Sequence, residues 1–171
     1  MRLFASLMKA DDEDESELSR MTQELYKNLP YADQYRAYPF SPGAITPDAL
    51  VDKRFVISST DANNKPFAIA CCALTAHRTY NLHGCDVEAH LVDLAVHPDY
   101  RRKGYGISVV TQAIEYCKSM YYKELYWKAY IENLPSAHLA LRMGFKLVPR
   151  QCSDKFNVFK LKLTQTTEKE F

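Results

Sequence analysis

The chain has 171 residues, of which 47% are hydrophobic and 25% are charged, a composition that fits one soluble globular domain and excludes wholesale disorder. Its 22 lysines and arginines nearly balance its 21 aspartates and glutamates, and a net charge of +1 offers no broad basic surface for nucleic acid. No run of about 18 apolar residues could span a membrane, and residues 1–10 are too short an apolar stretch for a signal peptide. We therefore expect one cytoplasmic domain over residues 1–171 that binds neither nucleic acid nor membrane, with residues 164–171 as a frayed tail.

The first elements are an opening strand and a helix. Residues 1–9 are apolar enough for a strand, although a short helix fits the same pattern. The acidic run at 11–17 is followed by apolar residues at helical spacing, from Leu18 to Leu25, and then by Lys27. Acids at the start and a base at the end suit the dipole of a helix. An acidic interaction tail is the alternative.

A proline-rich loop over residues 29–48 comes next, and it carries three tyrosines, Tyr31, Tyr35 and Tyr38. Long ordered loops on a rigid scaffold tend to carry binding function. We expect these tyrosines to line the site of an acceptor substrate, and the alternative is a lid that packs on the core.

Strands dominate the middle of the chain. Residues 54–59 and 66–76 predict a hairpin around a turn at 61–65. A second break is expected at 78–86, followed by a strand over 87–96 that ends because Pro98 follows.

The last third alternates between helices and strands. An apolar stripe predicts a helix of about four turns from Ile107, and residues 125–131 predict a strand. A short helix over 135–143 then leads to two closing strands, at 146–148 and 156–163. Five cysteines without a C-x-x-C pair predict reduced thiols rather than metal ligands.

The segment RRKGYG, residues 101–106, lies between the strand that ends at Val96 and the helix that starts at Ile107. Its glycines admit close backbone approach, the amides at a helix start donate hydrogen bonds, and three cations neutralise charge, so this loop predicts a phosphate site. A dinucleotide fingerprint would need glycine where Val109 stands, and the P-loop pattern is absent.

Residues 94–106, LAVHPDYRRKGYG, resemble the motif of the GNAT superfamily, whose core is [Arg/Gln]-x-x-Gly-x-[Gly/Ala] after a strand and a proline-containing turn. Asn133, a short helix and the sequence RMGF at 142–145 resemble the segment after the fifth strand of that family. The resemblance covers residues 87–148 well and the N-terminal third only by order of elements. It implies an α+β fold in α/β/α layers, with a mixed, mostly antiparallel sheet of about seven strands, splayed between the fourth and fifth, and about four helices.

The resemblance also implies acetyl-CoA as co-substrate, CoA as product and no metal. The strand end would pair with the pantetheine, the loop would hold the pyrophosphate, and the later helix would contact both ends. The residues so implied are Leu94, Ala95 and Val96, then Arg101, Arg102, Lys103, Gly104, Tyr105, Gly106 and Ile107, and finally Asn133, Ser136, His138 and Arg142. For Arg142 a solvated helix position is the alternative.

The implied reaction is direct attack of a primary amine on the acetyl thioester, which needs a base. When the chain is aligned with the family without gaps from the phosphate loop backward, His90 falls at the position where histone-acetylating members have a glutamate base. Alternation puts Glu88, His90 and Val92 on one face, and Leu91 and Asp93 on the other. An imidazole with a pKa of about 6.5 suits the task, so His90 is the first candidate and Glu88 the second, with a structural histidine as the alternative. Asp93 is a candidate ligand for a cationic acceptor.

The general acid is open, because many members carry a tyrosine four residues before the glycine of the Gly-Phe pair, where this chain has Ala140. Tyr130, Tyr105 or a tyrosine of the aromatic loop could substitute. The predicted function is acetyl transfer to an amine of a small molecule, amino acid or peptide by a monomer or homodimer. The alternatives are a catalytically impaired CoA-binding regulatory module and a nucleotide-phosphate protein of another fold.

Overall fold

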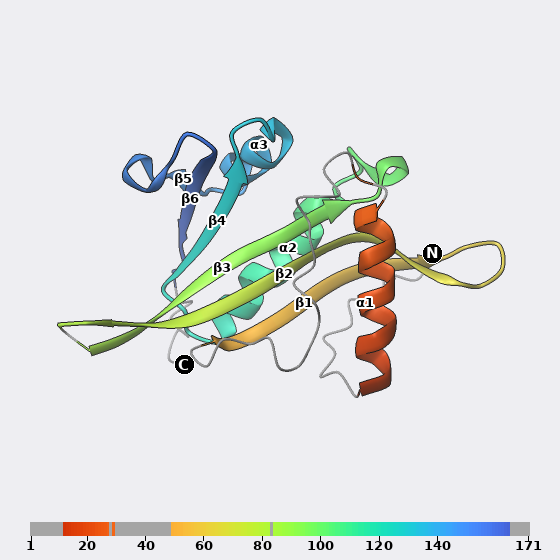
Figure 1. The fold of residues 1–171 in the computed structure, drawn as a ribbon, viewed down its shortest axis with the longest axis horizontal. Coiled ribbons are helices and arrows are strands. Elements are labelled where there is room, and N and C mark those ends of the chain that lie inside the picture. Colours follow the sequence, from red (N-terminus) through yellow and green to blue (C-terminus); the bar gives the residue numbers. More distant parts are fainter. Residues whose placement is uncertain (1–11, 28, 30–48, 83, 165–171) are drawn as a thin grey trace, which may run out of the picture.

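The computed structural model describes residues 12–27, 29, 49–82 and 84–164 (Figure 1). The predicted opening strand, the tail and the three tyrosines Tyr31, Tyr35 and Tyr38 lie outside these residues. Within the described ranges, no helix combines the length and the apolar character needed to cross a membrane.

The N-terminal half holds one helix and three long strands, namely α1 (Asp12–Lys27), β1 (Ala49–Thr60), β2 (Pro66–Asn81) and β3 (Gly84–Val96). Helix α1 starts in the acidic run and ends at a lysine, as the helix dipole favours. The predicted break at 78–86 is wrong, because the ladder between β2 and β3 continues to its last pair at the tip of the hairpin.

The C-terminal half contains two helices and three strands. They are α2 (Tyr105–Ser119), β4 (Glu124–Tyr130), α3 (Leu134–Arg142), β5 (Lys146–Leu147) and β6 (Phe156–Lys162). Short 3-10 turns at Pro98–Tyr100 and Pro149–Gln151 join the elements where proline removes a backbone donor.

The described strands form one sheet of six, in the order β1-β2-β3-β4-β6-β5. All neighbours are antiparallel except β3 and β4. This parallel pair is short, with only Ala89, His90 and Leu91 of β3 facing residues of β4. Beyond that point the two strands diverge (Figure 1). The predicted splayed, mixed sheet of an α+β fold is therefore confirmed, and the splay lies between β3 and β4.

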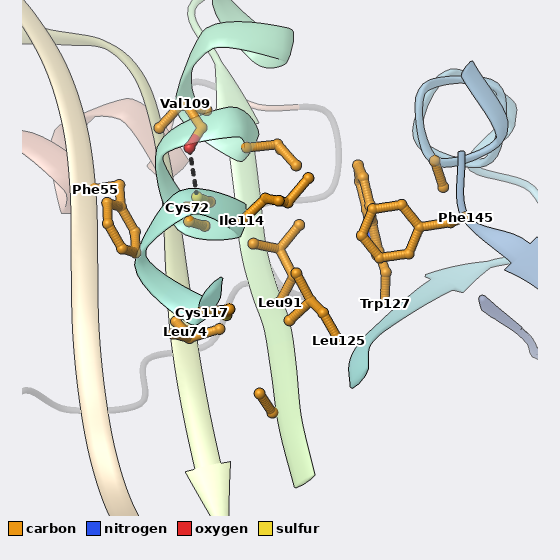
Figure 2. Close-up of a cluster of buried hydrophobic side chains, with 14 of the residues drawn as sticks. Phe55, Cys72, Leu74, Leu91, Val109, Ile114, Cys117, Leu125, Trp127 and Phe145 are labelled. Atoms are coloured by element: carbon orange, nitrogen blue, oxygen red, sulfur yellow. Dashed lines mark hydrogen bonds between the residues drawn. The ribbon is translucent and has the colours of Figure 1, made fainter. Parts of the chain in front are cut away.

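The main core fills the space between the sheet and α2 (Figure 2). Leu91 and Leu125 from the two parallel strands are buried there, together with Val109 of α2. Trp127 meets Phe145 edge to face at 5.5 Å between ring centroids, which ties β4 to the segment after α3. The core therefore holds the diverging strands at a defined separation although they share few hydrogen bonds.

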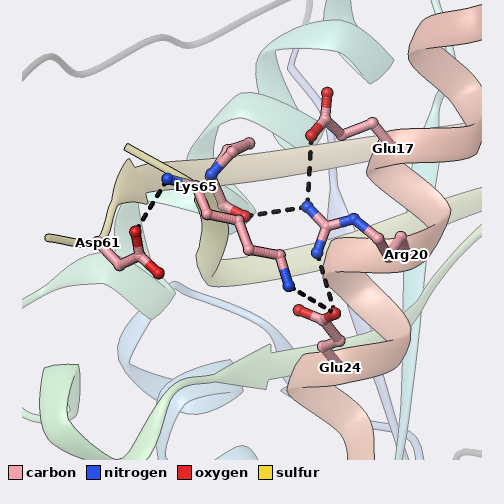
Figure 3. A network of polar contacts seen from close by, with 6 residues as sticks. Glu17, Arg20, Glu24, Asp61 and Lys65 are labelled. Carbon is pink, nitrogen blue, oxygen red and sulfur yellow. Dashed lines mark hydrogen bonds and ion pairs between the residues drawn. The ribbon is translucent and has the colours of Figure 1, made fainter. Parts of the chain in front are cut away.

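Helix α1 covers the opposite face of the sheet, over β2 and the end of β3 (Figure 1). A second apolar cluster lies under it, formed by Met21, Leu25, Leu29, Val56, Ala68, Cys71 and Ala95. At the edge of this cluster the guanidinium of Arg20 donates hydrogen bonds to Glu17, to Glu24 and to the carbonyl of Pro66 (Figure 3). Single exposed ion pairs contribute about 0–1 kcal/mol, so the apolar cluster supplies most of the free energy that attaches α1 to the sheet.

Candidate active site

The predicted phosphate loop, residues 101–106, is exposed at its start and leads directly into helix α2. Gly104 is the N-cap of α2 with φ of 87°, and Arg102 has φ of 62°, so the loop turns twice through the left-handed region that glycine adopts most easily. No side chain caps α2 and no acid lies in its first turn. The first N–H groups of a helix have no acceptor within the helix and carry the positive end of its dipole. This start of α2 therefore suits an anion.

Gly106 explains how close the neighbouring elements come to the start of α2. A Cβ atom there would lie 3.2 Å from Cδ2 of Leu139 and 3.5 Å from Cγ2 of Val96. A side chain at this position would therefore crowd Leu139 of α3 and come into van der Waals contact with Val96 at the end of β3. The glycine brings the phosphate loop, the splayed strand end and α3 together at one place.

The three cations of the loop are exposed. Arg101 donates through Nε to the carbonyl of Val96 at 3.3 Å, and Lys103 donates through Nζ to the carbonyl of Asp99 at 2.9 Å. None of the ion pairs found within the described ranges involves Arg101, Arg102 or Lys103. Their charges are thus held near the helix start without being neutralised by a carboxylate of the described chain.

The edge of β3 that faces the splay includes Leu94, Ala95 and Val96. In the part of the chain that the structure describes, the β3–β4 ladder ends at Leu91. An unpaired strand edge presents N–H and C=O groups that can pair with an extended ligand. The edge therefore leads from the phosphate loop toward His90.

A β-bulge interrupts β3 between these two places. Cys71 pairs with Ala95 and Ala73 pairs with Val92, so two residues of β3, Asp93 and Leu94, oppose one residue of β2. Asp93 has φ of 53°. The strict alternation predicted along this strand is therefore wrong beyond Val92, because the extra residue shifts the side-chain pattern by one position.

Glu88 and His90, the two predicted bases, are in contact. Nε2 of His90 lies 2.7 Å from Oε1 of Glu88, and the His90 side chain is 33% exposed. Burial lowers the pKa of His90, and the Glu88 carboxylate counteracts this only in part. A lowered pKa keeps the imidazole neutral near pH 7, which is the form that can accept a proton.

Tyr126 of β4 completes this cluster, and it was not among the predicted residues. It is the β4 partner of His90, and the two rings stack at 5.4 Å between centroids. Its hydroxyl donates to Glu124 at 2.9 Å, and burial together with that carboxylate raises the pKa of Tyr126 to about 12. His77 of β2 approaches from the other side, 6.2 Å from His90 between ring centroids. Tyr126 and His77 are remote from His90 in the sequence, so only the pairing of β3 with its neighbouring strands brings them together.

Tyr130 lies farther along β4. Its ring is 4.3 Å from that of Phe156 between centroids, and it lies four positions after Tyr126, which is about 13 Å along a strand. The structure therefore does not place Tyr130 beside His90. Ala140 is fully buried in the core, so the position where many family members carry a tyrosine offers no hydroxyl.

The predicted residues of the downstream helix lie at its start and on its outer surface. Asn133 is the N-cap of α3, and its side chain accepts a hydrogen bond from the Ser136 amide at 3.3 Å. His138 and Arg142 are exposed, and their contact with a cofactor stays a prediction. Across the described residues, no group of three or more histidine, cysteine or acidic side chains could hold a metal.

Several solved structures share this fold. The acetyl-CoA complex of Arabidopsis thaliana NAA60 superposes with a TM-score of 0.62 at 14% identity, covering 86% of this chain and 94% of that one. The NatC complex bound to Gag peptide and CoA gives 0.61 at 20% identity, covering 96% and 100%. The ribosomal-protein-S18-alanine N-acetyltransferase from Escherichia coli gives 0.55 at 15% identity, covering 98% and 99%. Identities this low establish the fold alone.

A sequence comparison identifies the family. No curated protein matches the chain. The model of the acetyltransferase (GNAT) family matches residues 16–145, which is more than half of the chain and runs from α1 to the end of the Gly-Phe pair. The matched range contains the phosphate loop, the splayed strands and the cluster around His90, and the chain therefore belongs to the acetyltransferase (GNAT) family.

Proposed function

We propose that this protein transfers an acetyl group from acetyl-CoA to the primary amine of a small molecule, amino acid or peptide, by direct attack in a ternary complex. The observation that carries the proposal is one continuous path. Among the described residues it runs from the start of α2, which has no side-chain cap, along the part of β3 beyond its ladder with β4, to the imidazole of His90, whose pKa burial lowers. The plant and NatC structures of the same fold contain acetyl-CoA and CoA, which supports this choice of co-substrate.

The residues at the start of α2 fit a CoA pyrophosphate. Backbone amides after Gly104 would bind it, and Arg101, Arg102 and Lys103 would neutralise its charge. The edge at Leu94–Val96 would pair with the amides of the pantetheine as an added strand does. When bound, the cofactor supplies an activated acetyl thioester.

His90 acts as the base in this proposal. Its neutral ring accepts the proton of the attacking amine, directly or through water, and Glu88 at 2.7 Å stabilises the imidazolium that forms. The stacked ring of Tyr126 holds the imidazole in place. Because Ala140 has no hydroxyl, the proton for the leaving group comes from water or from Tyr105 or Tyr130. Asp93 and the tyrosines of residues 30–48 remain the proposed acceptor contacts, in a cytoplasmic monomer or homodimer.

The second candidate function is a CoA-binding regulatory module with impaired catalysis. The observation in its favour is the buried Ala140 at the usual tyrosine position. The two functions differ in turnover and agree in cofactor binding, so a single pair of assays separates them.

The test combines acetyl-CoA titration calorimetry with thiol release in the presence of amines, amino acids, aminoglycosides and short peptides. An enzyme binds acetyl-CoA and releases thiol with at least one acceptor, whereas the regulatory module binds without turnover. His90→Ala should lower kcat and leave acetyl-CoA affinity unchanged, while Gly104→Val should abolish binding, because valine resists the φ of 87° that Gly104 adopts. Absence of acetyl-CoA binding by the wild-type protein would refute both functions.

A further inference from the structure

The β-bulge of β3 at Asp93 is stabilised by a contact from another element. A φ of 53° is uncommon for a residue other than glycine, and such conformations persist only where surrounding contacts enforce them. The hydroxyl of Tyr26, on helix α1, donates to the backbone carbonyl of Asp93 at 2.9 Å. These two residues are 67 positions apart in the sequence, so a tertiary contact supports the bulge in addition to the tolerance of aspartate for the left-handed region.

Tyr26 is well suited to this contact. Its side chain is partly buried against the apolar cluster under α1, and burial raises the pKa of its phenol far above the ordinary value. The phenol is therefore neutral and able to donate at any physiological pH. Sγ of Cys71 lies 3.5 Å from the same hydroxyl and can donate to it, which leaves the hydroxyl proton directed at Asp93.

The contact also fixes the next peptide group. A trans peptide is planar, and its C=O and N–H point in opposite directions; no cis peptide occurs among the described residues. Holding the carbonyl of Asp93 therefore sets the direction of the Leu94 N–H. Leu94 is the first residue of the edge assigned to the pantetheine, and Asp93 lies between that edge and His90.

We propose that Tyr26 is a positioning residue for acetyl transfer, which holds the β3 bulge so that the strand edge at Leu94 and the base at His90 keep the relative placement the reaction needs. This inference rests on the proposed function. In this proposal Tyr26 acts through the carbonyl of Asp93, so its loss should affect kcat and leave phosphate binding at the start of α2 intact.

The experiment compares Tyr26→Phe with Val56→Ala. The first change removes the hydroxyl and keeps the ring, while the second removes packing from the same cluster under α1 and keeps the hydrogen bond. Loss of one hydrogen bond that aligns reacting groups should lower kcat about five-fold. The KM for acetyl-CoA should stay within about two-fold of wild type, and Val56→Ala should leave kcat near wild type. Equal kcat values for the two variants would overturn the proposal.

Amide hydrogen exchange provides a readout that does not depend on turnover. Tyr26→Phe should speed exchange in a peptide that spans residues 92–95 by about ten-fold relative to Val56→Ala, and unchanged exchange there would contradict the inference. Failure of the proposed function would look different, because the wild-type protein would then release no thiol with any acceptor while exchange at the bulge still responded to Tyr26→Phe.

Discussion

The pH dependence of activity should move in opposite directions when the two charges around His90 are removed separately. Glu88 contacts the ring at 2.7 Å and raises the pKa of His90, whereas Lys128 and His77 lower it and burial lowers it most. The Tyr126 ring is neutral below its pKa of about 12. Glu88→Gln and Lys128→Ala therefore each remove one charge that acts on the His90 pKa, and both leave the Tyr126 ring stacked on His90 in place.

The sign follows from the form of the base. Activity falls at low pH as His90 becomes protonated, so a lower pKa moves the acid limb to lower pH. Glu88→Gln removes the group that raises the pKa, and the limb should move down; Lys128→Ala should move it up. Exposed ion pairs contribute about 0.2–1 kcal/mol, so the acid limb should move by about 0.15 to 0.7 pH unit for Glu88→Gln. The shift for Lys128→Ala should be smaller, because its ammonium lies over the ring of Phe156.

The assay is kcat/KM for the acceptor from pH 5 to 9 at saturating acetyl-CoA, which reports the essential base of the acceptor-free enzyme. An NMR titration of the His90 ring should show the same displacements without turnover. Lys118→Ala provides the control, because Lys118 lies on α2 and pairs with Glu115. If the limb moved in the same direction for Glu88→Gln and Lys128→Ala, His90 would not be the group that titrates.

Three further changes test the rest of the site and its support. Gly106→Val should raise the KM for acetyl-CoA at least ten-fold, because its Cβ would crowd Leu139 at 3.2 Å and Val96 at 3.5 Å; an unchanged KM would contradict the assigned cofactor path. Asn133→Ala should lower the free energy of unfolding by about 1 kcal/mol through loss of the α3 cap, as measured by urea denaturation, whereas Asn133→Asp keeps the acceptor and should cost less. Trp127→Ala should lower the free energy of unfolding by about 3–5 kcal/mol, and a loss below 1 kcal/mol in the same denaturation assay would show that β4 is not anchored as described.

Local features of this molecule could be predicted from its sequence. The glycines and cations around Gly104 lie within six residues, and the acidic start of α1 and the proline after Val96 are also short-range signals. The splayed sheet was expected from the family resemblance, which rests on two short segments, residues 94–106 and 133–145. These predictions succeed because the physical cause of each feature lies in neighbouring residues.

Long-range features could not be predicted. Tyr126 meets His90 through a parallel pairing of three residues, and no pattern in either strand specifies that register. The bulge at Asp93 has only a weak local signal, because aspartate adopts positive φ more readily than most residues but far less readily than glycine. The hydrogen bond that supports it comes from Tyr26 on a distant helix. The extension of the β2–β3 hairpin to Asn81 was missed, because cross-strand pairing outweighs the weak strand propensity of that segment.

The bulge gives β3 two halves with opposite side-chain phase. Ala89 and Leu91 belong to the main core, but after the extra residue Leu94 and Val96 pack against that core while Ala95 lies under α1. Removing one residue at the bulge would therefore restore plain alternation and leave Leu94 and Val96 on the core side, whereas a single-residue deletion elsewhere in the strand would put the residues beyond it on the opposite face. When this strand is aligned with a strand that has no bulge, the one-residue gap therefore belongs at Asp93. A gap placed elsewhere would assign residues of the cofactor edge to the wrong face of the sheet.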